Sequence, residues 1–338
     1  MSEIDIKPLD GLDVKPLDNG VLVFNQSEFG YRYREAISNS DLNLVALDPA
    51  LLELNKKIPA SNELTSRQVK QGRLFHKLFL ESNFVEKSKT FKVCETVEGR
   101  FIEQNAKLFS DGEVELSNDK CFSTITALKA QLKHDGYTLK TSDGFAEAMN
   151  LIRHNKLPYT LKEVEEIEAD ENGHTYITSE QMTKFYLMSE SLLNNGDFPK
   201  LYNASLNEVS AYVKPCETTY DLPLKARFDM MCQLDKLYIV DIKTISNIDD
   251  VRFNIYKYNY HRQAAFYRFV AEFLLVTENV EFVFAFVETE PKLGRYRSFV
   301  CQLNEETMHN GGVEVDNLLQ KYADYLNRDK NELSFVKI

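Results

Sequence analysis

The stretch LPLKARFDMMCQLDKLYIVDIKTI, residues 222–245, contains two runs rich in apolar and β-branched residues. The break between the runs is centred on Asp235, and this pattern predicts a β-hairpin. Asp229 lies as many residues before Asp235 as Asp241 lies after it, so the two aspartates are expected to face each other. Facing residues of an antiparallel pair have Cβ atoms about 5 Å apart, and like charges at that distance repel.

The hairpin also predicts which cations accompany these carboxylates. Because side chains alternate between the faces of a strand, Lys243 shares the face of Asp241, and Lys225 and Arg227 share the face of Asp229. The second run is apolar on both faces, which is typical of a strand inside a sheet. Two carboxylates on such a strand favour a bound cation, and Mg²⁺ or Mn²⁺ prefers oxygen ligands. One alternative stays open: Lys243 and Arg227 neutralise the aspartates without a metal.

Composition and charge are those of a soluble globular protein. The 338 residues are 43% hydrophobic and 27% charged, which suffices for a large domain with a full core. No apolar run reaches the roughly 20 residues that span a bilayer, and the N-terminus lacks the pattern of a secretory signal, so no membrane partner is expected. The five cysteines are scattered and never spaced as CxxC, which favours a cytoplasmic location. The net charge of −12 argues against a general nucleic-acid coating protein, but it leaves room for DNA in a local basic groove.

Local patterns predict the remaining elements. The tandem repeat DIKPLDGL and DVKPLDNG, within residues 5–20, predicts an extended arm, and the acidic segment 162–173 predicts a solvated face and loop. Helices are expected from about residue 41 and over 64–80, 178–193, 256–276 and 314–327, and further strands over 21–24, 207–213, 281–288 and 295–303. The fold class is therefore α/β, with a mixed central sheet flanked by helices.

The predicted elements suggest a domain organisation. Residues 1–30 are expected to form an extended arm, and residues 31–310 the main domain with a polar insert at about 95–175. A C-terminal helix and tail follow over residues 311–338.

Three positions outside the hairpin are candidate site residues. Glu208 lies on the strand just before the hairpin, from which it reaches the carboxylates. His76 lies on a helix and is either a packed histidine or a ligand. Ser40 lies where a helix begins, with Arg34 nearby, so this end is either simply capped or a phosphate site.

The predicted helix over 256–276 is the most basic part of the chain. Gln263 and Tyr267 are one turn apart on one face of this helix, and Arg262 is one of its cations. The interleaved tyrosines offer stacking surface for bases or sugars. The alternative is an ordinary helix surface.

Taken together, these pieces resemble the PD-(D/E)xK nuclease superfamily and, within it, the RecE-type (exonuclease VIII-like) phage recombination exonucleases. A single DxK is common by chance, whereas GxxxH, E, D, DxK and QxxxY in this order are specific. The matching pieces are ISNSDL (37–42), GRLFH (72–76), TSEQMTKFYLMSESLL (178–193), NEVSAYV (207–213), RFD (227–229), IVDIKT (239–244) and YNYHRQAAFY (258–267). The segment 95–175 and the N-terminal repeat have no counterpart in this resemblance.

The resemblance implies a role for each matching residue. Asp229 and Asp241 hold the metal together with the backbone carbonyl of Ile242. His76 and Glu208 complete the site. Lys243 polarises the attacking water or stabilises the charge that develops on phosphorus. The implied DNA contacts are Gln263, Tyr267, Arg227, Lys225, Ser40, Arg34 and Arg262, with Ser40 near a terminal 5′-phosphate.

The resemblance also implies an activity and partners. We expect a phosphodiester hydrolase that uses Mg²⁺, replaceable by Mn²⁺, at two ions per site. It digests double-stranded DNA from 5′ to 3′ and leaves 3′ tails for phage-type recombination in a bacterial cytoplasm. A homo-oligomeric ring and a single-strand annealing protein are the implied partners. Two alternatives are a structure-specific endonuclease of the same superfamily and a non-catalytic module that binds DNA ends.

Overall fold

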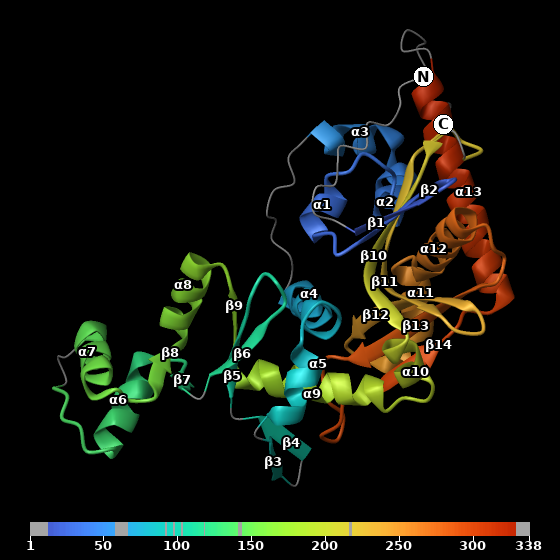
Figure 1. Cartoon of the computed structure of the whole chain (residues 1–338). Helices are drawn as coiled ribbons and strands as arrows, with labels where there is room; N and C mark the ends of the chain where they lie inside the picture. Colours follow the sequence, from blue (N-terminus) through green and yellow to red (C-terminus); the bar gives the residue numbers. More distant parts are fainter. Residues whose placement is uncertain are drawn as a thin grey trace. The chain divides into compact units, whose positions relative to one another are not determined.

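The computed structural model describes residues 13–57, 67–91, 93–96, 99–102, 104–117, 119–140, 144–215 and 218–328 (Figure 1). They belong to two compact units, which are described separately below. The first unit comprises Met1–Gln68, Leu192–Val287 and Ser298–Ile338, and the second comprises Val69–Ser191 and Glu288–Arg297. As predicted, the fold class is α/β with a large mixed central sheet flanked by helices. None of the described helices is both long and apolar enough to cross a membrane.

A seven-stranded sheet forms the centre of the first unit. Its strands, in spatial order, are β1 (Asp13–Leu17), β2 (Gly20–Phe24), β10 (Ser205–Val213), β11 (Leu224–Gln233), β12 (Leu237–Ile245), β13 (Val280–Glu288) and β14 (Ser298–Cys301). The pairs from β1 to β12 are antiparallel, and so is the pair of β13 with β14. Two helices connect β12 to its neighbour β13, which is the connection typical of parallel strands.

The predicted hairpin is confirmed with its register. β11 and β12 pair from Gln233 and Leu237 at the turn to Met230 and Val240, which centres the turn on Asp235. β12 lies between β11 and β13, so the prediction of an interior strand is also confirmed.

Helices cover one face of the sheet in the first unit (Figure 1). The long helix α12 packs on β10 and β11, α13 packs along α12, and α2 contacts both helices. Gly311 of α13 makes this approach possible, because a Cβ there would come within 2.3 Å of the carbonyl oxygen of His261. The helices of this unit are α1 (Glu28–Arg32), α2 (Asn39–Leu47), α3 (Pro49–Lys57), α10 (Phe198–Asn203), η3 (Ile248–Asp250), α11 (Val251–Lys257), α12 (Tyr260–Leu275) and α13 (Glu305–Asn327).

Apolar side chains of alternate strand residues fill the space under these helices. The large core joins Val209 and Ala211 of β10 and Phe228 of β11 to Phe266 of α12, all of which are buried. A smaller cluster contains Val21, Val23 and Tyr212, which pack together with Val14 and Tyr31. Both clusters use residues of β2 and β10, so side chains from the two faces of these strands are packed, which fixes β2 firmly in the sheet.

The second unit contains the GRLFH and TSEQ segments. Phe75 and Leu78 of α4 are buried, and α9 begins with a capping box, in which Thr178 and Gln181 are bonded to each other. Its elements are α4 (Arg67–Leu80), α5 (Phe84–Lys87), η1 (Ser88–Thr90), β3 (Val93–Thr96), β4 (Gly99–Ile102), β5 (Asn105–Leu108), β6 (Val114–Ser117), β7 (Lys120–Phe122), α6 (Ile125–His134), α7 (Phe145–Asn155), β8 (Tyr159–Leu161), α8 (Lys162–Asn172), β9 (Thr175–Ile177) and α9 (Ser179–Leu193).

Several predicted elements differ from the structure. The helix expected over 256–276 is two helices, because Asn259 adopts a left-handed conformation (φ 55°) between α11 and α12. The last helix begins at Glu305 rather than at 314, capped by Asn304. The strand expected over 295–303 is shortened to β14.

Two segments form regular elements that were not predicted. The acidic segment over 162–173, predicted as a solvated face and loop, is the largely exposed helix α8, which ends at the left-handed Gly173. The second copy of the N-terminal repeat forms the edge strand β1 rather than a free arm, while the first copy lies outside the described residues. Pro16 of β1 suits an edge strand, because proline has no N–H for a further neighbour.

Candidate active site

Asp229 and Asp241 lie just beyond the last pair of the β11–β12 ladder, which is the pair of Met230 with Val240. The carboxylate of Asp229 accepts a 2.7 Å hydrogen bond from the backbone N–H of Ile242. The hairpin thus turns one aspartate toward the strand that carries the other. Ile242 takes part in the site through its N–H, while the predicted role of its carbonyl stays a prediction.

Burial and a neighbouring negative charge both raise the pKa of Asp229. Burial of the carboxyl, followed by the negative charge of Asp241, raises the pKa of Asp229 above its ordinary 3.8. Lys243 and Arg227 lower this pKa, but they do not outweigh the other two effects. Negative charge at Asp229 is therefore not fully compensated by the lysine and arginine of the hairpin.

Both oxygens of Asp241 are engaged. Its side chain is only 2% exposed, and Oδ2 lies 2.6 Å from Nζ of Lys243. Oδ1 accepts a 2.7 Å hydrogen bond from Nε2 of Gln263 on α12. Burial by itself lowers the pKa of Lys243, but the carboxylates of Asp241 and Asp229 outweigh burial and raise this pKa above 10.5. The two carboxylates therefore favour the charged form of Lys243. We call Asp229, Asp241, Lys243 and Gln263 the aspartate cluster.

Two tyrosines of α12 border the aspartate cluster. The ring of Tyr267 packs on Phe228, with ring centres 5.6 Å apart, and burial followed by the charge of Asp241 raises the pKa of Tyr267. Nζ of Lys243 lies 5.1 Å from the centre of the Tyr260 ring. Tyr260 was missed by the sequence interpretation. Its spacing of three residues before Gln263 on one helix was the signal that pointed to it.

Glu208 lies beside Asp229 on the neighbouring strand β10. The pairs of Asn207 with Met230 and Val209 with Phe228 place Glu208 opposite Asp229. Oxygen atoms of these two carboxylates lie within 4.8 Å of each other. Glu208 also forms an ion pair with Nε of Arg227.

The backbone of Glu208 is unusual for a strand residue. Its φ of 54° lies in the left-handed region, although the register of β10 with β11 is the same on both sides of it. Such a conformation is unfavourable for a side chain larger than glycine, and strain of this kind concentrates at functional sites.

The three carboxylates fit a hard divalent cation. Asp229 and Glu208 offer oxygens within 4.8 Å of each other. Asp241 directly precedes Ile242, whose backbone N–H donates to the carboxylate of Asp229, and the negative charge of Asp241 acts on Asp229. Carboxylate oxygens are the ligands that Mg²⁺ and Mn²⁺ prefer. The raised pKa of Asp229 indicates a site where an added positive charge is stabilising.

Two predicted DNA contacts, Arg34 and Lys225, lie on the segment before α2 or beside it. Nζ of Lys225 donates hydrogen bonds to the carbonyl oxygens of Tyr31, Arg32 and Arg34, at 3.2, 3.1 and 2.7 Å. The guanidinium of Arg34 lies 4.6 Å from the centre of the Tyr212 ring. These contacts hold the segment that leads into α2 against β10 and β11.

Ser40 lies in the first turn of α2, next to the helix cap. Asp41 accepts hydrogen bonds from the N–H and the hydroxyl of Ser38, at 2.8 and 2.7 Å, and the hydroxyls of Ser38 and Ser40 are 2.8 Å apart. Ser38 is the cap, and the helix begins at Asn39 rather than at about residue 41.

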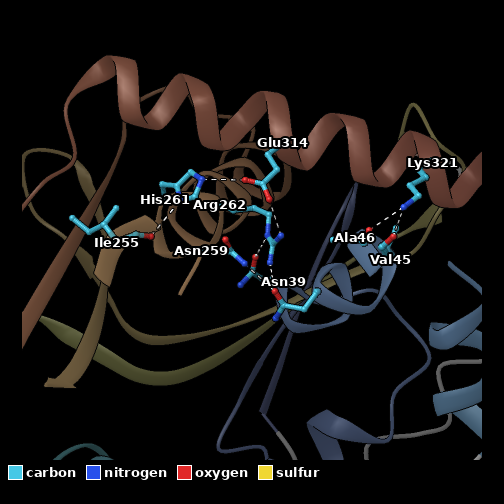
Figure 2. A network of polar contacts seen from close by, with 10 residues as sticks. Asn39, Val45, Ala46, Ile255, Asn259, His261, Arg262, Glu314 and Lys321 are labelled. Carbon is cyan, nitrogen blue, oxygen red and sulfur yellow. Dashed lines mark hydrogen bonds and ion pairs between the residues drawn. The ribbon is translucent and has the colours of Figure 1, made fainter. Parts of the chain in front are cut away.

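Arg262 lies in a network that joins the three helices α2, α12 and α13 (Figure 2). Its side chain is 1% exposed and lies 2.8 Å from Glu314 of α13. It also donates hydrogen bonds to the side-chain oxygens of Asn39 and Asn43 of α2. His261 bonds the same Glu314 at 3.0 Å. We call Asn39, Asn43, His261, Arg262 and Glu314 the helix network.

Comparison with known proteins identifies the family. Residues 154–332 match the family model described as "PDDEXK-like domain of unknown function (DUF3799)". This match covers more than half of the chain and includes Glu208, the whole aspartate cluster and Tyr267. The chain belongs to this PDDEXK-like family. The predicted superfamily is thereby confirmed, and the coarse prediction of a metal-dependent nuclease is supported.

Curated proteins and solved structures add little to this assignment. No curated protein matches the chain. A protein from Eubacterium rectale named "Putative exonuclease" is 13% identical over 82% of this chain and 97% of its own, with a TM-score of 0.35. The protein SSO0001 is 16% identical over 62% of this chain and 90% of its own, with a TM-score of 0.23. Likenesses this low carry no argument about this chain.

The remaining predicted site residue of this PDDEXK-like chain, His76, lies on α4 in the second unit. The aspartate cluster and Glu208 belong to the first unit. The role of His76 therefore stays a prediction from the GRLFH motif, as do the DNA contacts of Arg34, Ser40, Lys225, Arg227, Arg262, Gln263 and Tyr267.

Proposed function

We propose that this protein is a Mg²⁺-dependent exodeoxyribonuclease that digests double-stranded DNA from a 5′ end and leaves a 3′ single-stranded tail. The observation that supports it most is the buried Asp241, whose oxygens are held by Lys243 and Gln263 beside the raised-pKa carboxyl of Asp229. The 5′-to-3′ polarity comes from the resemblance to RecE-type exonucleases.

Asp229, Asp241 and Glu208 are the proposed cation ligands, with His76 and the carbonyl of Ile242 added from the family motif. Two divalent cations bound there would supply an activated water and offset the charge of the leaving 3′-oxygen. Mn²⁺ is expected to replace Mg²⁺, because both prefer oxygen ligands.

The chain's own residues provide the rest of the chemistry. Lys243 stays protonated, so it presents a fixed positive charge where the phosphate becomes most anionic. Gln263 fixes the orientation of Asp241 through the bond to Oδ1. Tyr267, packed on Phe228, closes one side of the site with apolar surface, which strengthens these electrostatic interactions.

The seven residues that the resemblance implies as DNA contacts fall into two groups. Gln263, Tyr267, Arg227, Ser40 and Arg34 are proposed to contact the DNA, with Ser40 near a terminal 5′-phosphate. Lys225 and Arg262 are proposed to act indirectly, because their cationic groups are bound to backbone carbonyls and to Glu314, respectively. They support the segment and helix that carry Arg34 and Ser40.

The proposed partners follow from the resemblance. A homo-oligomeric ring around the DNA is consistent with processive digestion by a chain of net charge −12, whose outer surface repels DNA. A single-strand annealing protein that takes over the 3′ tail would link the nuclease to phage-type recombination in the bacterial cytoplasm.

The test uses linear duplex DNA labelled at one 5′ end and, separately, at one 3′ end, beside the same DNA closed into a circle. We expect loss of the 5′ label first, only from the linear DNA, and only with Mg²⁺ or Mn²⁺. Lys243→Ala is expected to be inactive. Lys236→Ala is the matched control, because Lys236 lies in the turn of the same hairpin and pairs with Glu281.

Two results would replace the proposal. Cutting of the closed circle would identify a structure-specific endonuclease. Absence of cleavage by folded protein with either cation, together with retained binding of DNA ends, would identify a non-catalytic module.

A further inference from the structure

Exposed aromatic side chains are concentrated on α11, directly after the strand that carries Asp241 and Lys243. Phe253 is 67% exposed and Tyr258, at the end of the helix, is 52% exposed. Aromatic rings are normally buried, and several exposed together mark a binding surface. Tyr256 is also exposed, but its hydroxyl lies 3.2 Å from that of Thr307, which ties it to α13.

A lysine lies between the two exposed rings. Nζ of Lys257 is 5.6 Å from the ring centre of Phe253 and 4.9 Å from that of Tyr258. A cation at this distance interacts with the ring faces and holds the side chains in a common arrangement.

The rings continue from the surface to the aspartate cluster. The ring centre of Tyr258 is 5.7 Å from that of Tyr260, and the Tyr260 ring is 5.1 Å from Nζ of Lys243. Tyr260 is itself supported by Phe284 of β13, with ring centres 5.7 Å apart. Phe253, Tyr258 and Tyr260 thus form an aromatic track that ends at the proposed catalytic lysine.

The charged residues around the exposed rings of α11 do not give this surface a net positive charge that would attract DNA. Asp249 and Asp250, just before α11, are exposed and carry negative charge, which offsets the positive charges of Arg252 and Lys257. Binding of DNA here must therefore depend mainly on stacking. Base stacking on aromatic side chains contributes about 1–3 kcal/mol per base and is tolerant of sequence.

We propose that the aromatic track binds unpaired bases of the strand that is being hydrolysed. The inference rests on the proposed nuclease function and adds the part of the substrate that the track recognises. With a phosphate of that strand beside Lys243, the adjoining bases stack along Tyr260, Tyr258 and Phe253. The track thereby keeps the strand end apart from its complement.

The absence of tryptophan from the chain makes this proposal measurable. Tyr258→Trp and Phe253→Trp each introduce a single tryptophan, which can be excited selectively beside the 17 tyrosines of the wild type and can stack on a base. In EDTA, which prevents hydrolysis, oligo(dT) is expected to quench both variants, whereas an abasic oligomer of equal length and heparin are not. Phe299→Trp is the matched control, because Phe299 is 46% exposed on β14.

Alanine variants measure the contribution of each ring. Tyr258→Ala and Phe253→Ala are expected to weaken oligo(dT) binding by about 5- to 150-fold each, and Phe299→Ala is expected to have no effect. Thermal unfolding of each variant verifies that it is folded.

Two results would overturn the proposal. One is equal quenching by the abasic oligomer, or unchanged affinity of the alanine variants. The other is a change in oligomeric mass by light scattering without a change in oligo(dT) affinity, which would make the track a protein interface. The digestion of linear DNA by the wild type is measured separately, so failure of the nuclease function and failure of the track are distinguishable.

Discussion

Arg262 and Gln263 are neighbours on α12, yet they belong to polar clusters of opposite character. In the helix network, a single buried guanidinium meets Glu314 and two asparagine oxygens, so charge and hydrogen bonds are balanced (Figure 2). In the aspartate cluster, burial and the charge of Asp241 disfavour the ionised form of Asp229 even with Lys243 present. A balanced buried network fixes helices, whereas an unbalanced one is ready for a cation or a substrate.

Asp241→Asn is expected to give the largest difference between the loss of nuclease activity and the loss of stability. This change removes a proposed cation ligand and the partner of Lys243, so Mg²⁺-dependent nuclease activity should fall by about 1,000-fold or more, equivalent to about 4 kcal/mol in the barrier. The thermal unfolding midpoint is expected to stay close to that of the wild type. Rates on end-labelled linear DNA and a melting curve measure the two effects. Equal losses of activity and of folded protein would contradict the comparison.

Arg262→Ala should reduce the stability of the fold rather than act directly on the chemistry of the site. We expect the free energy of unfolding to drop by about 2–4 kcal/mol, somewhat less than for a fully buried pair, because Glu314 is 35% exposed and keeps part of its hydration. Urea denaturation measures the loss.

Arg268→Ala is the matched control for Arg262→Ala. Arg268 lies on the same helix and pairs with Glu272, but it is 40% exposed, so the expected loss is below about 1 kcal/mol. Similar losses for the two arginines would contradict the role of the helix network.

Asp229→Asn is expected to stabilise the metal-free protein, in contrast to Arg262→Ala. The asparagine oxygen still accepts the hydrogen bond of Ile242, while the repulsion from Asp241 disappears. The metal-free protein should therefore gain about 1–2 kcal/mol of stability at neutral pH, since one pKa unit corresponds to about 1.4 kcal/mol. The stabilisation of the wild type by added Mg²⁺ should be lost in this variant.

The pH dependence follows from the raised pKa of Asp229. A carboxyl whose pKa is raised on folding stabilises the fold at low pH, and this contribution is lost as the pH rises from 3.8 through the raised value. Melting of the metal-free wild type and of Asp229→Asn across this range tests the sign. The gap between the two proteins should widen as the pH rises.

Lys321→Ala is expected to have the smallest effect. Nζ of Lys321 donates to the carbonyls of Val45 and Ala46 at the end of α2, at 2.8 and 3.1 Å (Figure 2). Losing this contact should reduce stability by about 0.3–1 kcal/mol. Hydrogen exchange should rise in the last turn of α2, while the turn at Asn39 and Asn43, held by Arg262, keeps its protection. Uniform loss of protection along α2 would contradict this division.

The hairpin and its register were predictable because they depend on a local pattern. Alternating apolar residues and a short turn centred on Asp235 predict the register up to the pair of Met230 with Val240, next to Asp229 and Asp241, without knowledge of the rest of the fold. The resemblance implied that Gln263 is a DNA contact at the site, and the structure adds that Nε2 of Gln263 donates a hydrogen bond to Asp241.

The partners of each lysine and arginine side chain were not predictable from a local pattern. Arg262 belonged to a basic stretch of sequence, but its partner Glu314 is on a helix that was expected to begin only at residue 314. The break at Asn259 was also missed, because no proline or glycine marks it and asparagine tolerates the left-handed conformation. Partners from distant segments decide whether a lysine or an arginine faces a ligand or the core.

The pairing of β2 with β10 has a consequence for biosynthesis. Val23 pairs with Ser210, so the central sheet joins chain segments that leave the ribosome far apart in time, with the residues of the second unit between them. Such high contact order slows folding and leaves early strands exposed. A nascent chain that stops before residue 205 would present the edge of β2 without its partner, and we expect it to aggregate unless a chaperone covers it.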